Sequence, residues 1–125
     1  AATLRLEYNV SVLGYCYGGS LAWLAMQKSF IFEKGICYYG SSIPEFLESN
    51  VNCPGMLHFG SDDKGIPIES IEKVKKFINM NTNKIELFVY ENADHGFNCN
   101  QRKSYNKIAA EKAFEKTIKF LKDLK

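Results

Sequence analysis

Short apolar runs alternate with segments of helical periodicity, and this alternation limits the possible folds more than any other feature of the chain. The strand-like runs occupy residues 10–13, 35–39, 56–59 and 85–90. Apolar residues recur at helical spacing in segments at 20–28, from Pro67 onward and at 107–124. Because strands that alternate with helices build βαβ units, we expect an α/β fold with a mainly parallel sheet flanked by helices.

Two of the predicted helices carry apolar stripes that should face the sheet. In the helix that opens at Pro67, a favourable residue for an early helical position, the stripe consists of Ile71, Val74, Phe77 and Ile78. In the helix at 107–124, the residues expected to face inward are Ile108, Ala113, Phe114, Ile118 and Leu121.

The size and charge of the chain exclude several classes of protein. The 125 residues have the length of one domain, so we expect a single domain over residues 1–125. A net charge of +2 gives no electrostatic footprint for nucleic acid or an anionic membrane. No apolar run approaches the roughly 20 residues of a bilayer helix. The four cysteines lack CxxC spacing, which disfavours zinc, and without a visible signal peptide we expect reduced thiols in the cytoplasm.

The first strand-like run ends in Gly14-Tyr15-Cys16-Tyr17-Gly18-Gly19, which leads directly into a helical segment. This is the pattern of a nucleophile elbow with cysteine in place of serine. We expect Gly14 and Gly18 to avoid collisions in the sharp turn. The helix N-terminus favours a thiolate at Cys16, and the backbone N–H of Tyr17 is expected to serve the oxyanion hole. Taken alone, the pattern fits a buried structural cysteine equally well.

Acidic and histidine residues follow the next strand-like runs. Asp62 and Asp63 follow the third run, and the spacing to the next helix favours Asp63 as a triad acid, with helix capping as the alternative. His95 follows the fourth run and is favoured as the base over His58, which lies inside the third run and suits a core histidine. The chain order of nucleophile, acid and base matches that of α/β-hydrolases. Since the carboxyl ends of parallel strands meet at one edge, Cys16, Asp63 and His95 should converge there.

Three segments resemble the dienelactone hydrolase family, the carboxymethylenebutenolidase-like branch of the α/β-hydrolases. They are GYCYGG at 14–19, CPGMLHFGSDDKGIP at 53–67 and DHGFNCNQRKSYN at 94–106. The resemblance implies hydrolysis of a small-molecule ester or lactone without a cofactor, with Cys16 as nucleophile, His95 as base and Asp63 as its orienting partner. It also makes Arg102 a candidate for holding a substrate carboxylate, with a surface ion pair as the alternative.

Members of that family carry several strands and helices before the elbow, whereas this chain has roughly nine residues there. We therefore expect a partial α/β-hydrolase fold that lacks the N-terminal strands. The open edge of the first strand should be covered by self-association, by an upstream segment or by residues 3–8, which alternate apolar and polar. A catalytically inactive remnant acting as a binding or scaffold module is the alternative function. A thiol-based redox protein is disfavoured because the sequence shows no resolving partner for Cys16.

Overall fold

The computed structural model describes residues 8–81 and 84–123, and its strands form a parallel sheet. The strands are β1 (Val12–Tyr15), β2 (Gly35–Tyr38), β3 (Gly55–Gly60) and β4 (Ile85–Tyr90), and they lie side by side in chain order. Every neighbouring pair is parallel, with Gly14 opposite Cys37 and Cys37 opposite Leu57. The predicted fold class is confirmed, although β1 begins later than the apolar run at 10–13 suggested.

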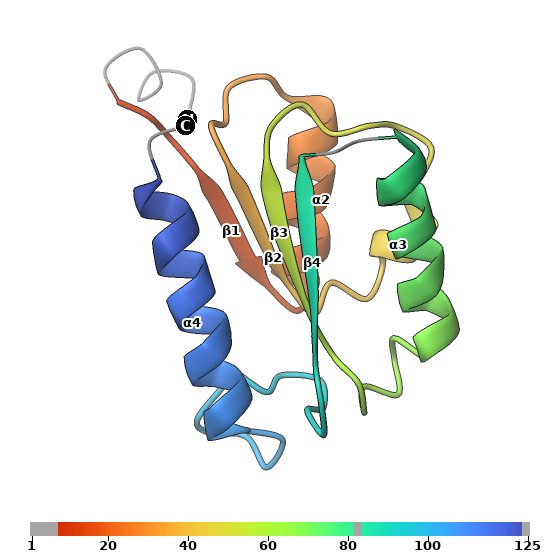
Figure 1. The fold of residues 1–125 in the computed structure, drawn as a ribbon, viewed down its shortest axis with the longest axis vertical. Coiled ribbons are helices and arrows are strands. Elements are labelled where there is room, and N and C mark those ends of the chain that lie inside the picture. The colour runs from red at the N-terminus through yellow and green to blue at the C-terminus, as the bar shows by residue number, and fades with distance from the viewer. Residues whose placement is uncertain (1–7, 82–83, 124–125) are drawn as a thin grey trace.

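Helices lie on both sides of this sheet (Figure 1). On one side are α2 (Tyr17–Lys28) and α3 (Ile68–Asn81), and on the other is α4 (Lys107–Lys122). A short 3-10 helix, η1 (Ile43–Glu45), lies between β2 and β3 in the chain. In the described part of the chain, no helix combines the length and apolar character needed to cross a membrane.

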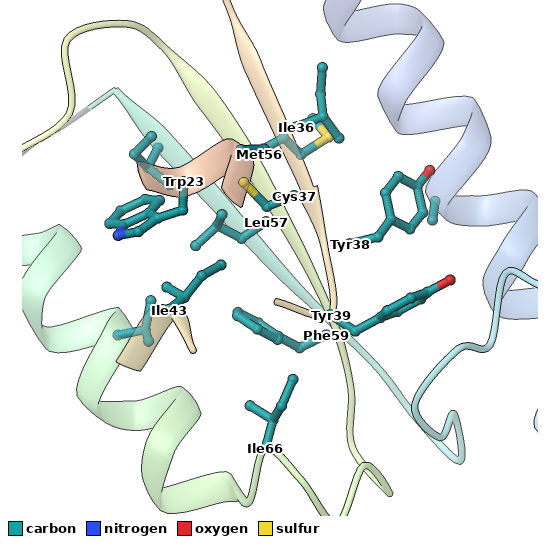
Figure 2. Packing of buried hydrophobic residues seen from close by; sticks show 14 of the residues in the cluster. Trp23, Ile36, Cys37, Tyr38, Tyr39, Ile43, Met56, Leu57, Phe59 and Ile66 are labelled. Carbon is teal, nitrogen blue, oxygen red and sulfur yellow. The ribbon is translucent and has the colours of Figure 1, made fainter. Parts of the chain in front are cut away.

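Buried side chains point alternately to the two faces of the sheet. Figure 2 shows Cys37 and Leu57 on the side of α2, and Ile36, Met56 and Tyr38 on the side of α4. All five side chains are almost fully inaccessible to solvent. Burial of both faces is the usual condition of a parallel sheet, and it explains why the strands read as continuous apolar runs.

The two apolar stripes predicted for the helices have different outcomes. The stripe of α3 packs inward as predicted, with Ile71, Val74 and Ile78 buried. The stripe predicted for α4 was wrong at Ile108, Phe114 and Leu121, which are exposed, whereas Ala113 is buried and Ile118 half-buried. The helix instead buries a face of small residues, namely Ala109, Ala110, Ala113 and Thr117. Ile108 and Phe114 are 67% and 61% exposed. The small residues let α4 lie close to a sheet face already filled by Tyr38 and His58, so Ile108 and Phe114 face away from the sheet.

The C-terminal end of α4 is held by a buried lysine. Lys34 is 7% exposed, and its ammonium group donates hydrogen bonds to the carbonyls of Phe120 and Asp123. A cation at this end also complements the partial negative charge of the helix terminus. The link fixes α4 against the segment that enters β2.

β1 lies at one edge of the sheet. β1 pairs with β2 on one side, and among the described residues no strand pairs with its other side. Leu13 and Tyr15 of β1 are 39% and 45% exposed. Of the covering strand expected at residues 3–8, residues 3–7 lie outside the described residues, and Tyr8 is exposed. The described chain therefore presents an unpaired strand edge beside the nucleophile elbow.

Candidate active site

Cys16 occupies the sharp turn between β1 and α2. Its backbone has φ 56° and ψ −122°, a combination that non-glycine residues rarely adopt. The N–H of Cys16 donates to the carbonyl of Tyr38 at 3.1 Å, and its carbonyl accepts from the N–H of Gly19 at 2.9 Å. The turn is thus fixed at both ends, and it places Cys16 at the carboxyl edge of the sheet.

Close backbone contacts explain two of the glycines around this turn. A Cβ at Gly14 would lie 1.9 Å from the carbonyl oxygen of Gly18, and a Cβ at Gly19 would lie 2.5 Å from that of Tyr38. A Cβ at Gly18 would meet nothing within 4 Å. The steric role predicted for Gly18 was therefore wrong, because its backbone, and not a side-chain position, faces Gly14.

A buried carboxylate follows β3 and points at a histidine that follows β4. Asp63 is 3% exposed, and its Oδ2 lies 2.7 Å from Nδ1 of His95. Its other oxygen, Oδ1, accepts the backbone N–H of Gly65 at 2.9 Å. The exposed Asp62 instead contacts the hydroxyl of Ser61 at 3.3 Å. The pairing orients the His95 ring and leaves Nε2 for proton transfer.

Tyr39 packs against His95 and lines the same hollow as Cys16. The rings of Tyr39 and His95 pack with centroids 5.1 Å apart and a tilt of 57°. In the ranges 8–81 and 84–123, no hydrogen bond joins Cys16 to His95; the Sγ of Cys16 accepts a long one, 3.9 Å, from Nη1 of Arg102. The structure thus joins His95 to Asp63 and Cys16 to Arg102, with Tyr39 adjoining both pairs.

An open hollow of about 340 Å³ lies over the elbow, and its walls are formed by Tyr15, Cys16, Tyr39, Asn98, Cys99 and Arg102. The Arg102 side chain reaches it by lying across Gly96, where a Cβ would stand 2.3 Å from Nη1. Gly96 has φ 76°, which also favours glycine. A larger hollow, about 590 Å³, is formed by α4 and contains none of these residues, so the smaller one is the candidate site.

The predicted oxyanion donor belongs to the first residue of α2. Because Tyr17 opens the helix, its N–H has no intrahelical acceptor, which is the property that the role requires. The Tyr17 side chain is 75% exposed. The backbone N–H of Tyr17, and not its side chain, therefore suits the predicted oxyanion role.

Sequence reasoning missed four residues of the hollow, Tyr15, Tyr39, Asn98 and Cys99. Tyr39 has φ 39° and directly follows β2, so its strand-end position was a signal that could have identified it. Burial raises the pKa of the Tyr39 hydroxyl, and the neighbouring Cys16 adds to the rise, so this phenol stays protonated. Cys99 lies in an irregular loop, where neither periodicity nor a strand end marked it.

His58 is a core residue with both ring nitrogens hydrogen-bonded. Nδ1 lies 2.8 Å from the Tyr90 hydroxyl, and Nε2 lies 3.1 Å from the Thr117 hydroxyl. Burial lowers the pKa of His58 to about 3, and the nearby positive charge of Lys116 adds to the fall. His58 is therefore a neutral structural residue. Within the described ranges, no three His, Cys, Asp or Glu side chains form a group that could hold a metal ion.

Comparison with known proteins decides the family. Residues 3–125 match the model of the dienelactone hydrolase family. The chain belongs to the dienelactone hydrolase family. A relative, the carboxymethylenebutenolidase of Pseudomonas putida, is 30% identical over 118 residues, which make up 93% of this chain and 49% of that protein.

Solved structures show the same fold as this dienelactone hydrolase family chain. A Klebsiella pneumoniae protein assigned as a dienelactone hydrolase superposes with a TM-score of 0.80 at 23% identity, over 90% of this chain and 52% of that one. Esterase 2 of Thermogutta terrifontis gives a TM-score of 0.70 at 16% identity, over 90% and 54%. The chain spans about half the length of the curated relatives it matches.

Proposed function

We propose that this chain carries the nucleophile, base and acid of a hydrolase for small esters or lactones. The observation that supports this most is the buried Asp63 carboxylate, held 2.7 Å from Nδ1 of His95 at the sheet edge where the Cys16 elbow stands. A histidine oriented by a carboxylate beside a strained nucleophile is the arrangement used for acyl transfer.

Before the first half of the proposed reaction, the Cys16 thiol gives its proton to Nε2 of His95, and the Cys16 thiolate then attacks the substrate carbonyl carbon. The N–H of Tyr17 receives the developing oxyanion, since it has no acceptor within α2. His95 then gives a proton from Nε2 to the departing alkoxide, while Asp63 stabilises the imidazolium. The product of this half is an acyl group on Cys16.

In the second half, His95 takes a proton from water, which attacks the acyl thioester and releases the acid. Arg102 is proposed to hold a carboxylate on the substrate, because its guanidinium lies beside Cys16 at the wall of the hollow. All of these steps use groups of the protein and water, so we propose that the reaction needs no cofactor.

The names of the relatives support the substrate class. The Pseudomonas putida relative is a carboxymethylenebutenolidase, and the Thermogutta terrifontis structure is an esterase. A small ester or lactone also suits a hollow of about 340 Å³. We further propose a cytoplasmic location, because all four cysteines are free thiols in the structure.

Hydrolysis of a chromogenic acetate ester tests the proposal. We expect release of the chromophore by the native chain and loss of the activity in Cys16→Ala and His95→Gln. A brief reaction quenched in acid should add the mass of one acetyl group to the peptide that contains Cys16. Asp63→Asn should also lose activity. Its matched control is Asp62→Asn, since Asp62 is exposed and outside the proposed machinery. Activity that survives in Cys16→Ala would overturn the assignment.

The second candidate is a catalytically inactive remnant that acts as a binding or scaffold module. It is favoured by the absence, among the described residues, of a hydrogen bond between Cys16 and His95, together with the edge of β1 that no described strand covers. This candidate predicts a folded chain that neither hydrolyses the ester nor acquires an acetyl group. The two measurements above therefore separate the candidates.

A further inference from the structure

Two cysteines far apart in sequence share one hollow. Cys16 and Cys99 both belong to the walls of the 340 Å³ hollow over the elbow. Both thiols also lie near the Tyr39 hydroxyl, whose pKa is raised first by burial, then by Cys16 and, to a smaller extent, by Cys99. Cys99 thus supplies a second thiol to the hollow that contains the proposed nucleophile.

The loop that carries Cys99 is open to solvent, whereas the elbow is fixed. The N–H of Cys99 donates to the carbonyl of Gly96 at 2.9 Å, and its carbonyl accepts from the N–H of Arg102 at 3.1 Å. Residues 99–103 are all exposed, so these turns can adjust with little loss of packing. Any approach of the two sulfurs would therefore come from the loop and not from Cys16.

Arg102 connects the two thiols. Its backbone closes the turn that begins at Cys99, and its guanidinium lies 3.9 Å from the Sγ of Cys16. The guanidinium thus lies beside the sulfur that a peroxide would oxidise in the proposed chemistry.

The other two cysteines are poorly placed for thiol chemistry. Cys37 is fully buried in β2, and burial raises its pKa far above that of a free thiol. Cys53 is 3% exposed, and burial raises its pKa to about 11. Thiol oxidation by a reagent in solvent is therefore directed to Cys16 and Cys99.

We propose that Cys16 and Cys99 form a reversible disulfide when a peroxide oxidises Cys16. The Cys16 thiolate attacks one oxygen of hydrogen peroxide, the O–O bond breaks, and Cys16 becomes a sulfenic acid as one water forms. Cys99 then attacks the Cys16 sulfur, the S–S bond forms, and the sulfenic oxygen leaves as a second water. Two thiols lose two electrons in total, and one peroxide is reduced to two waters.

The disulfide has two consequences for the site. It occupies the sulfur proposed as the nucleophile, and it protects that sulfur from irreversible oxidation to the sulfinic acid. A thiol reductant restores both cysteines. The proposal needs the shared hollow and an oxidisable Cys16 but does not need ester hydrolysis, so it can hold even where the proposed hydrolase activity fails.

Peptide mapping after oxidation tests the proposal. The reduced 125-residue chain is treated with an equimolar amount of hydrogen peroxide, its remaining thiols are blocked under denaturing conditions, and it is digested without reductant. We expect two of the four thiols to be lost, one peptide pair linking Cys16 to Cys99, and full recovery with dithiothreitol. Detection of a Cys99–Cys99 link between two chains in its place would overturn the proposal.

Cys99→Ser provides the second arm, and we expect this variant to fold because Cys99 is exposed. Without a resolving thiol, Cys16 should accumulate as a sulfenic acid that dimedone traps, and further peroxide should convert it to the sulfinic acid several-fold faster than in the native chain. Equal dimedone labelling of Cys16 in the native chain and in Cys99→Ser would show that Cys99 does not resolve it.

Discussion

Acidification should destabilise the protein through His58, because the folded core holds this histidine neutral. Its ring nitrogens are committed to Tyr90 and Thr117, and burial lowers its pKa to about 3 from an ordinary value of 6.5. The unfolded chain takes up a proton as the pH falls below about 6.5, whereas the folded chain resists it until the pH approaches 3. The free energy of unfolding should therefore fall with decreasing pH across this window.

The size of the effect follows from the two pKa values. Their difference corresponds to roughly 5 kcal/mol when the titration is complete, at about 1.4 kcal/mol for each pH unit. Between about pH 8 and pH 5 the expected loss is about 2 kcal/mol, since His58 is then charged in the unfolded chain alone. A loss of this size is a large fraction of the roughly 5–15 kcal/mol that stabilises a typical domain.

Urea unfolding followed by the fluorescence of the buried Trp23 measures the loss. His58→Gln keeps a polar side chain but removes the titrating ring, so its stability should depend less on pH than that of the native chain, by about 2 kcal/mol over the same interval. His95→Gln is the matched control, because its side chain is 33% exposed and His58 remains. Lys116→Gln should raise the pKa of His58 in the folded chain, so the further loss of stability below about pH 5 should be smaller than in the native chain.

Parallel stability curves for the native chain and His58→Gln would refute this reasoning. If His58→Gln does not fold, the native chain still provides a test through NMR titration of its imidazole resonances. The ring of His58 should show no protonation shift down to about pH 4 in the folded state. A midpoint near 6.5 would show that the fold does not hold His58 neutral.

Three further predictions concern the site and the sheet edge. Replacing Asp63 with Asn should lower ester hydrolysis by roughly 10³-fold or more, because an amide does not hold His95 in the required tautomer; an unchanged rate would remove Asp63 from the mechanism. Brief iodoacetamide treatment near neutral pH should label Cys16 fastest of the four thiols, and mapping that finds Cys53 or Cys99 labelled first would contradict a thiolate at the elbow. Size exclusion with light scattering should find the isolated chain self-associated, or bound to an upstream segment where one is supplied, because the edge of β1 is open; a cooperatively folding monomer would argue against this.

Strand periodicity and strand ends made much of the fold and part of the site predictable. The apolar run at Ile85–Tyr90 is the strand itself, and the segment after Pro67 is a helix with its stripe buried. Asp63 and His95 could be named together because parallel strands bring their carboxyl ends to one edge. The catalytic roles of these residues remain predictions.

Periodicity failed where two faces of one element were both apolar. In α4 the sequence favours the face with Phe114 and Ile108, but the helix buries the alanine face that contains Ala113. The choice depends on the space left by Tyr38 on the sheet, which is a property of tertiary packing and not of local sequence. Cys99 was missed for a related reason, because loop geometry and not spacing brings it to Cys16.

The backbone of Cys16 makes the nucleophile a product of complete folding. Its φ of 56° and ψ of −122° cost on the order of 1–3 kcal/mol, and this conformation lasts only while the surrounding contacts enforce it. One of these is the hydrogen bond to Tyr38, which exists only once β1 lies beside β2. A nascent or frayed chain would let Cys16 relax to an ordinary conformation. The rate at which a reagent modifies this thiol should therefore rise late in refolding, after the sheet has formed. This rate would report when folding is complete.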